Sequence, residues 1–435
     1  MKRQEQSLWW IYALTLLAML PALVLRDFTP DNELRYLSIA DEALREGQVW
    51  CFTNHGLWYA DKPPLYLWIV MGCRWLFGAH YMLPLALFSA IPMLLIGRIM
   101  DRWAVSSGAI TDRSQRVLAL LMLFTCAYFP GAGLTVRMDM LMTLFIVLAL
   151  LETWRLTVDG SGSVWMVGLW SFLGLFTKGP LGIIFPLLGS LAFCLWTGRG
   201  RKWLHAWSWP AWLVMLGGCV VWWTGVWFEG GQEYLDNLLF HQTVDRAHNA
   251  FHHARPWWYY LVAMWYVMAP WSLLMAWFAV RKPREAVSGS FRRMMLAVGG
   301  VTLVVLSCIS GKLQIYLLPA IPFMVYWLAT MLTPGRRYLG IRMTAYVILA
   351  LIFAFGCALP WLNPMVGYGP VSRQARAMDA PAVVISSEVR RGENIDAYFD
   401  RPVPVVSADS LSTLPQGTII LAPGTGGNKL EIVTK

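Results

Sequence analysis

The chain has too few charged residues for a water-soluble protein. Of its 435 residues, 14% are charged and 57% are hydrophobic, whereas a soluble domain carries about a quarter charged residues. The mean hydropathy is +0.51. Cysteine is also scarce, with seven residues in the whole chain, which excludes a small disulfide scaffold. These shortages exclude soluble and disordered proteins, and they indicate an all-α protein that crosses a membrane many times.

Hydrophobic runs recur along most of the chain at about the 20-residue length that crosses a bilayer as a helix. The 25 tryptophans suit the aromatic belts found at both membrane interfaces. We predict eleven spans, at about 8–25, 79–97, 117–130, 138–154, 163–178, 181–197, 206–227, 257–280, 294–310, 314–333 and 343–363.

The basic residues between the spans sort to one side of the membrane. By the positive-inside rule this side is cytoplasmic, so we expect a multi-pass membrane protein with its N-terminus inside and its C-terminus outside. The net charge of +10 is then a topology signal, and no nucleic-acid partner is expected. The eighteen basic residues that fall on the predicted cytoplasmic side are Lys2, Arg3, Arg98, Arg102, Arg113, Arg116, Arg155, Arg199, Arg201, Lys202, Arg281, Lys282, Arg284, Arg292, Arg293, Arg336, Arg337 and Arg342.

Three larger segments fall on the opposite side, at residues 26–78, 228–256 and 364–435. We expect a membrane domain over 1–363 and a small α/β domain on the outer side over 364–435, where β-like runs at 382–386, 403–407 and 418–423 surround a polar helical stretch. Residues 63–78 are apolar but interrupted by Arg74, which predicts a helix in the interface. No fixed-period repeat occurs, which argues against an inverted-repeat transporter.

Polar side chains collect directly after the first span. Asp31, Glu33, Arg35 and Tyr36 fall within six positions. A helix cap formed by Pro30 and Asp31 would account for one of the acids but not for the other three side chains. We therefore predict that this segment contributes to a functional site.

Two more polar clusters face the same side. Lys62 follows Tyr59 and Asp61 and precedes two prolines, which would hold the lysine rigidly; the structural alternative is a snorkelling lysine. Arg137 and Asp139 stand at the outer entrance of the fourth span. An ionisable residue there is costly unless it is paired, so it indicates either function or a structural ion pair.

Lysines also mark two further turns on this side. Lys178 lies between spans five and six, and Lys312 precedes Tyr316 in a later hairpin. Together with Lys62, they place three cations outside, against the positive-inside trend. Such an arrangement is typical of a site that neutralises a lipid-linked phosphate or pyrophosphate.

The second large segment is rich in histidine. Four of the chain's seven histidines fall within residues 241–253, together with Arg246. No HExxH or other firm zinc spacing occurs. A divalent metal held by Asp61 with His252 or His253 is one interpretation, and a polar lid without metal is the other.

Taken in order, these motifs resemble the aminoarabinose lipid A transferases and, more broadly, the GT-C membrane glycosyltransferases that include the protein O-mannosyltransferases. The resemblance runs through residues 8–333 and implies a GT-C-like fold. Its motifs are an acidic-Arg-Tyr segment, Lys-Pro, Arg-x-Asp, Thr-Lys-Gly, a His-rich loop ending in Trp-Tyr-Tyr, and Gly-Lys-Leu-x-x-Tyr-x-Leu-Pro.

The resemblance also implies roles for individual residues. The family pattern Asp-Glu-x-Arg-Tyr reads Asn32-Glu33-Leu34-Arg35-Tyr36 in this chain, so either Asp31 or Glu33 takes the place of the first catalytic acid. The second acid is matched by Asp139. The residues implied to bind the donor phosphate are Lys62, Arg137, Lys178, Lys312 and Tyr316, those implied to bind substrate are Arg35, Tyr36, Tyr59 and Arg246, and the implied metal ligands are Asp61 and His253.

The function implied is transfer of a sugar from a polyprenyl phosphate, such as undecaprenyl phosphate, to an acceptor on the periplasmic side of the bacterial inner membrane, where the 364–435 domain would also lie. Lipid A is the leading acceptor, and other lipids or glycans fit the same motifs. Two alternatives are a transporter or flippase of lipid-linked sugars and an O-antigen ligase or polymerase. A transporter should carry ionisable residues near the middle of the membrane, whereas here they gather at one face.

Overall fold

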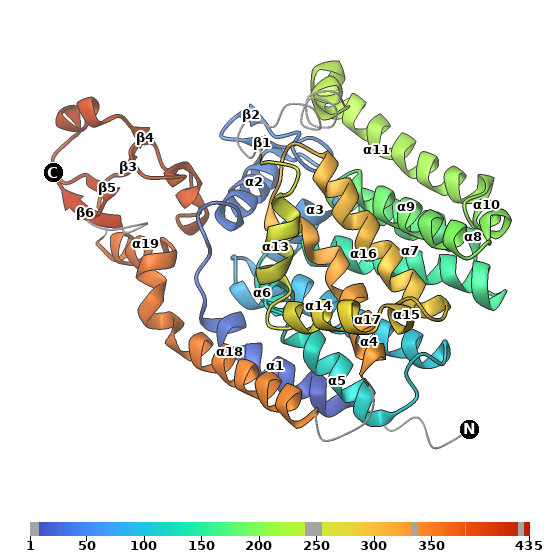
Figure 1. Ribbon diagram of the computed structural model, residues 1–435. Coiled ribbons are helices and arrows are strands. Elements are labelled where there is room, and N and C mark those ends of the chain that lie inside the picture. Colours follow the sequence, from blue (N-terminus) through green and yellow to red (C-terminus); the bar gives the residue numbers. More distant parts are fainter. Residues whose placement is uncertain (1–7, 240–254, 333–337, 379, 425–429) are drawn as a thin grey trace.

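The computed structural model describes residues 8–239, 255–332, 338–378, 380–424 and 430–435. It is a bundle of helices with a small α/β domain beyond one end (Figure 1). The helices of the bundle are α1 (Trp9–Leu25), α4 (Met82–Ser106), α5 (Arg113–Phe124), α6 (Tyr128–Leu134), α7 (Asp139–Trp154), α8 (Val164–Lys178), α9 (Leu181–Trp196), α10 (Gly200–Ala206), α11 (Trp209–Asp236), α13 (Tyr259–Val267), α14 (Ser272–Arg281), α15 (Pro283–Ala286), α16 (Ser290–Cys308), α17 (Ile321–Met331) and α18 (Tyr338–Val366), with a π-helical turn η1 (Arg155–Asp159) and a 3-10 turn η3 (Gln314–Ala320).

The predicted multi-pass helical fold is confirmed. Within the described residues, six helical segments are long and apolar enough to cross a membrane, or eight if two bent pairs each form one span. The bends are 61° between α5 and α6 and 112° between α13 and α14. Four more apolar helices of the described residues are shorter, namely α1, α3 (Leu65–Phe77), α8 and α9. The count of eleven spans therefore stays a prediction.

Helix α7 forms the centre of the bundle. It packs against α4, α8, α9 and η3, and most of its side chains are buried. A helix that is apolar on nearly every side must be surrounded in this way. Its first residue is Asp139, so the central packing of α7 fixes the position of this carboxylate.

The first large segment folds into α2 (Glu33–Glu46), a short hairpin of β1 (Thr53–Asn54) and β2 (Leu57–Trp58), and α3 (Leu65–Phe77). Helix α3 occupies the predicted 63–78 range, and it packs against α2. The carboxylate of Glu229 in α11 accepts hydrogen bonds of 2.8–3.2 Å from the backbone N–H groups of residues 49–51. This contact ties the segment to the long helix α11.

The C-terminal domain consists of α19 (Gly369–Ala377), β3 (Val383–Ser386), η4 (Gly392–Tyr398), β4 (Val405–Val406), η5 (Ala408–Thr413), β5 (Ile419–Pro423) and β6 (Leu430–Thr434). The sheet order is β4-β3-β5-β6. Strand β3 is parallel to both of its neighbours, β4 and β5, whereas β6 is antiparallel to β5. Strands β3 to β5 fall in the three predicted runs, whereas β6 was not predicted. Helix α18 continues to Val366, three residues past the predicted domain boundary, which stays a prediction.

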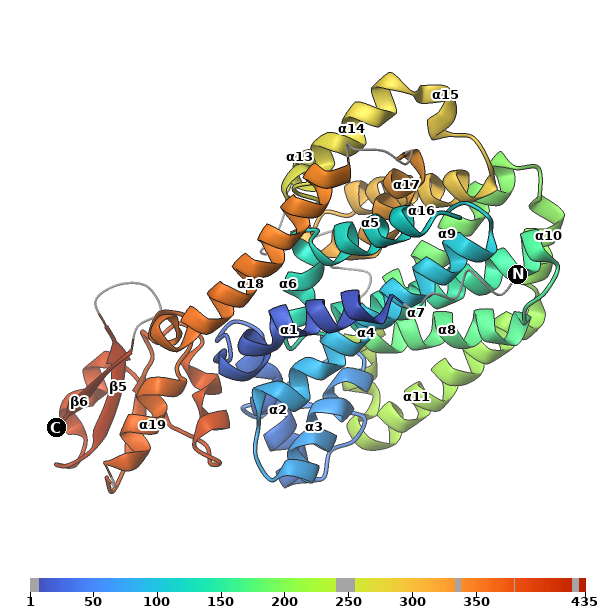
Figure 2. The ribbon, with the colours of Figure 1, turned by 90° about the horizontal axis from the view of Figure 1, so that it is seen from below.

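This domain rests against α2 (Figure 2). Ser38 of α2 donates a hydrogen bond of 3.1 Å to Asp396. Asp27, just before α2, accepts bonds of 2.7 Å from the Tyr398 hydroxyl and the Gly369 backbone N–H. Burial raises the pKa of the Asp27 carboxyl, because the charged form is poorly solvated there. The domain is thus fixed to the first segment by buried polar contacts.

Candidate active site

A cavity of about 580 Å³ opens where the first segment, the bundle and the C-terminal domain meet. Its lining includes four arginines and one carboxylate, that of Asp31, among the described residues. A cavity of this size and charge suits an anionic ligand. The lining residues are Asp31, Asn32 and Arg35; Ala127, Tyr128, Gly131, Ala132, Thr135 and Arg137; Leu313, Gln314 and Ile315; and Arg390 and Arg391.

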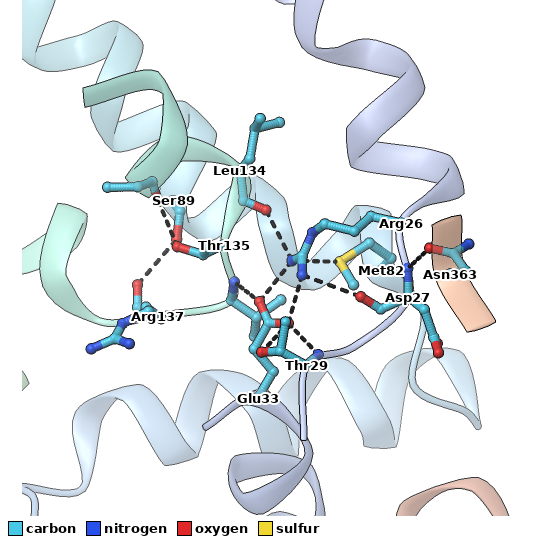
Figure 3. A network of polar contacts seen from close by, with 12 residues as sticks. Arg26, Asp27, Thr29, Glu33, Met82, Ser89, Leu134, Thr135, Arg137 and Asn363 are labelled. Carbon is cyan, nitrogen blue, oxygen red and sulfur yellow. Dashed lines mark hydrogen bonds and ion pairs between the residues drawn. The ribbon is translucent and has the colours of Figure 1, made fainter. Parts of the chain in front are cut away.

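Beside the cavity lies a buried network centred on Glu33 (Figure 3). The guanidinium of Arg26 donates bonds of 2.7 and 2.6 Å to the two carboxylate oxygens. Further bonds reach Glu33 from the Thr29 backbone N–H (2.8 Å), the Thr29 hydroxyl (3.0 Å) and the Val136 backbone N–H (2.7 Å). Burial alone would raise the pKa of Glu33, but the charge of Arg26 and these bonds hold it below its ordinary value.

The Glu33 network joins three parts of the chain. In addition to its two bonds to Glu33, Arg26 donates a hydrogen bond of 3.0 Å to the Leu134 carbonyl at the end of α6. Because Glu33 also binds Val136, the network fixes the link between α6 and α7. Arg137 is the next residue in this link, so the network sets the course of the backbone that brings Arg137 to the cavity.

Asp139 is buried at the first turn of α7 and contacts two cations. It accepts a hydrogen bond of 3.1 Å from Arg137 Nε and another from Lys178 Nζ. The ammonium of Lys178 lies over the ring of Tyr316, 4.5 Å from its centroid, in a cation–π contact. The structure therefore brings together four residues that the sequence analysis selected from three separate motifs.

The position of Lys178 follows from the hairpin between α8 and α9. A Cβ atom on Gly182 would lie 2.1 Å from the backbone carbon of Gly174, so only glycine permits these two helices to approach so closely. Gly179, with φ +114°, makes the turn directly after Lys178. The tight hairpin holds the lysine at the end of α8, beside α7.

Asp31 lies at the mouth of the cavity and is paired across domains. Its two oxygens accept bonds of 3.1 and 3.0 Å from the guanidinium of Arg390. The Asp31 side chain is 45% exposed and that of Arg390 69% exposed. The two candidate first acids thus differ: Glu33 is enclosed by donors from the chain, whereas Asp31 is open to solvent.

Of the predicted substrate-binding residues, Arg35 lies in the cavity wall and Tyr59 lies next to it. The guanidinium of Arg35 lies over the ring of Tyr59 at 5.6 Å from the centroid. Tyr36 is instead buried edge-on against Tyr66, with ring centroids 5.8 Å apart. Burial raises the pKa of Tyr36 to about 12, so its hydroxyl stays protonated at neutral pH.

The remaining candidates stand outside the described cavity lining. Lys312 is buried, directly precedes the lining residue Leu313, and donates a hydrogen bond to the Ile309 carbonyl. Asp61 and Lys62 are half-buried in the turn before α3. Arg246 and His253 lie outside the described residues. Within those residues, no group of three or more His, Cys, Asp or Glu side chains is placed to hold a metal ion.

Sequence reasoning missed three arginines of this region, Arg26, Arg390 and Arg391. Arg26 follows the first span on the predicted outer side, against the positive-inside trend, and this placement was a usable signal. Arg390 and Arg391 are adjacent in the C-terminal domain. Their role depends on how that domain packs, which no motif in the segment indicates.

No family model matches the chain. It is similar in sequence to proteins named undecaprenyl phosphate-alpha-4-amino-4-deoxy-L-arabinose arabinosyl transferase. That of Erwinia tasmaniensis is 26% identical over 304 residues, 68% of this chain and 54% of that protein. That of Enterobacter sp. strain 638 is 25% identical over 333 residues, 73% of this chain and 58% of that protein. The match thus spans little more than half the length of these relatives.

Solved structures extend the likeness to nearly the whole chain. ArnT from Cupriavidus metallidurans, bound to undecaprenyl phosphate, superposes with a TM-score of 0.71 over 95% of this chain and 92% of that one, at 17% identity. The chain has the GT-C fold. The archaeal oligosaccharyltransferase AglB from Archaeoglobus fulgidus shares this GT-C fold more distantly, with a TM-score of 0.54 over 91% of this chain and 64% of that one, at 12% identity.

Proposed function

We propose that the chain is a GT-C glycosyltransferase that moves a sugar from a polyprenyl phosphate, most simply undecaprenyl phosphate, to an acceptor at the outer face of the bacterial inner membrane. The observation that carries this proposal is the cavity lined by Asp31 and four arginines, next to the buried contacts of Asp139 with Arg137 and Lys178. The names of the relatives and the ligand of the ArnT structure support the same donor class.

The cations act on the donor phosphate. When the bond between sugar and phosphate breaks, negative charge develops on the leaving phosphate, and fixed cations stabilise it. Arg137 lines the cavity and is held by Asp139, so it is the best-placed phosphate ligand. Lys178, Tyr316, Lys62 and Lys312 complete the proposed donor site. Asp139 would be a positioning residue, because its described contacts are with Arg137 and Lys178.

Of the two candidate first acids, the contacts favour Asp31 for the reaction. Each oxygen of Glu33 already accepts at least two hydrogen bonds from the chain, which leaves little capacity for a substrate. Asp31 faces the cavity. It would accept the proton of an acceptor hydroxyl as general base, or orient an acceptor that is itself a phosphate. Arg35, Tyr59 and Arg246 would bind sugar or acceptor, and Tyr36 would support them from within.

The contacts at the two ends of the bundle support an orientation of the protein in the membrane, which we propose here. At the end near the cavity, hydrogen bonds join neighbouring helix ends: the Val136 backbone N–H donates to Glu33 at the start of α2, and Lys178 at the end of α8 donates to Asp139 at the start of α7. The other helix ends, which include many of the basic residues, make separate contacts: Arg116 of α5 pairs with Asp101 of α4, and Arg292 of α16 donates a hydrogen bond to Thr330 of α17. By the positive-inside rule, the cavity and the C-terminal domain would face the periplasm. Lipid A is the acceptor we propose first, because the chain resembles the aminoarabinose lipid A transferases.

A divalent metal held by Asp61 and His253 stays a proposal with a direct test. If the ion assists the leaving phosphate, EDTA should lower the transfer rate, and added Mn²⁺ or Mg²⁺ should restore it. The Asp61→Asn variant should then lose its response to EDTA. An unchanged rate after chelation would assign the histidine-rich segment to a role without metal.

The test of the function is transfer by the purified protein in nanodiscs, with a panel of undecaprenyl-phosphate sugars and total membrane lipid as acceptor. We expect sugar in a new lipid, lost in Asp31→Asn. The control is Glu46→Gln, an exposed acid at the other end of α2, which should leave transfer unchanged. No transfer with any donor, together with flipping of a labelled lipid-linked sugar, would replace the transferase by the flippase.

A further inference from the structure

Two arginines of the C-terminal domain reach the cavity. Arg390 and Arg391 lie in the turn just before η4, and both are among the lining residues. Arg390 makes the paired bonds to Asp31, although the two residues are 359 positions apart. The wall of the cavity is therefore completed by a domain that follows all of the predicted spans.

The turn that carries these arginines is held in place by buried groups. The hydroxyl of Tyr368, whose side chain is almost fully buried, donates a bond of 2.6 Å to the Arg390 carbonyl. Arg391 has φ +54°, in the left-handed region that non-glycine residues seldom adopt. Gly392 closes the turn with a bond of 3.1 Å to the Val389 carbonyl. A strained backbone persists only where its surroundings fix it, so the two side chains start from a defined position.

The pair between Arg390 and Asp31 is suited to exchange. The Arg390 side chain is largely exposed and that of Asp31 is about half exposed, and an ion pair this open to solvent contributes little to stability. Arg391 contacts only one acid of the described residues, Glu393, at 3.9 Å. Arg35 has no carboxylate partner in the described part of the chain. A phosphate would gain paired, charge-assisted bonds from a guanidinium fork, which are stronger than the contacts it would displace.

We propose that Arg390 and Arg391 form an acceptor subsite for a phosphate-bearing lipid headgroup, with Arg390 moving from Asp31 to that phosphate. In the absence of acceptor the Asp31 carboxylate is paired with Arg390, and acceptor binding frees it for the reaction. The C-terminal domain thus selects the acceptor, while the membrane domain holds the donor. This inference rests on the proposed transferase function.

The test compares Arg390→Gln, Arg391→Gln and the double variant with wild type in nanodiscs. The acceptors are lipid A with both phosphates and the same lipid after enzymatic dephosphorylation. The KM for the phosphorylated acceptor should rise about tenfold or more in the double variant, as expected for lost bonds to a charged group, with the KM for donor unchanged. Arg390→Lys should recover part of the loss. The control is Arg401→Gln, an exposed arginine of the same domain outside the described cavity lining.

A binding measurement separates this inference from the function itself. Quenching of tryptophan fluorescence by each form of lipid A is measured for the same variants without donor. Wild type and Arg401→Gln should prefer the phosphorylated form, and the double variant should lose this preference; that result would support the subsite. If, in addition, no donor supports transfer, the transferase proposal is wrong although the subsite is supported. Equal KM and equal binding in wild type and double variant would overturn the subsite while leaving the transferase intact.

Discussion

Replacing Glu33 by Gln distinguishes a structural carboxylate from a reacting one. In the wild type, the two oxygens of Glu33 accept five hydrogen bonds, two of them from Arg26. Glutamine keeps the shape, but its amide nitrogen would face donors where an acceptor is needed. The charge of Arg26, whose side chain is about nine-tenths buried, would also lose its counter-ion.

The magnitude can be worked out in two ways. Loss of two bonds to a charged group, at about 1.5–3 kcal/mol each, gives roughly 3–6 kcal/mol. Breaking a buried ion pair by removing one partner costs about 3–5 kcal/mol. We therefore expect Glu33→Gln to lower the free energy of unfolding by about 3–5 kcal/mol. Asp31→Asn removes only an exposed pair with Arg390, so it should cost less than about 1 kcal/mol.

The assay is equilibrium unfolding in mixed micelles, followed by tryptophan fluorescence, alongside transfer activity. Glu285→Gln, which breaks the exposed pair with Lys282, is the control and should behave like wild type. The double variant Arg26→Met/Glu33→Gln should recover part of the stability, because it removes the unpaired charge. The reasoning is refuted if Glu33→Gln unfolds like wild type but loses transfer, since Glu33 would then be the reacting acid.

Three further outcomes are expected. Asp139→Asn should lower kcat about a hundredfold or more, because Arg137 and Lys178 lose the carboxylate that positions them; full activity in a folded variant would remove Asp139 from the site. Lys62→Ala should raise the KM for the donor and not that for the acceptor, and equal increases would contradict a phosphate role. Since burial raises the pKa of Asp27 above its ordinary value in the docked domain, the protonated carboxyl favours docking, and amide-exchange protection of η4 should increase as the pH falls through this raised pKa. Asp27→Asn should reduce that increase, and an identical pH response in this variant would show that another group is responsible.

Much of the membrane domain could be predicted because hydrophobic length and charge act locally. The hairpin at Gly179 and the helix over 65–77 are both readable from a few adjacent residues. The broken α5–α6 and α13–α14 pairs were not predicted, although Pro270, which lies between α13 and α14, was a usable signal for the second of these bends.

The candidate site was predictable in its residues but not in its contacts. The position of Lys178 against Asp139 and Tyr316 joins three separate hairpins, and hydropathy contains no information on which hairpins are neighbours. The distinction between Asp31 and Glu33 depended on Arg26 and Val136, which lie outside the motif itself. The contribution of Arg390 required the docked C-terminal domain.

The long sequence separation between Asp31 and Arg390 has a consequence for biosynthesis. Chains emerge from the ribosome N-terminus first, so Arg26 and Glu33, seven residues apart, can neutralise each other as soon as the first segment has been synthesised. The partner of Asp31 arrives only after the last span has been inserted. A nascent chain would therefore hold an incomplete cavity throughout insertion, and a release of the chain before residue 390 would leave a membrane-embedded protein without its final wall.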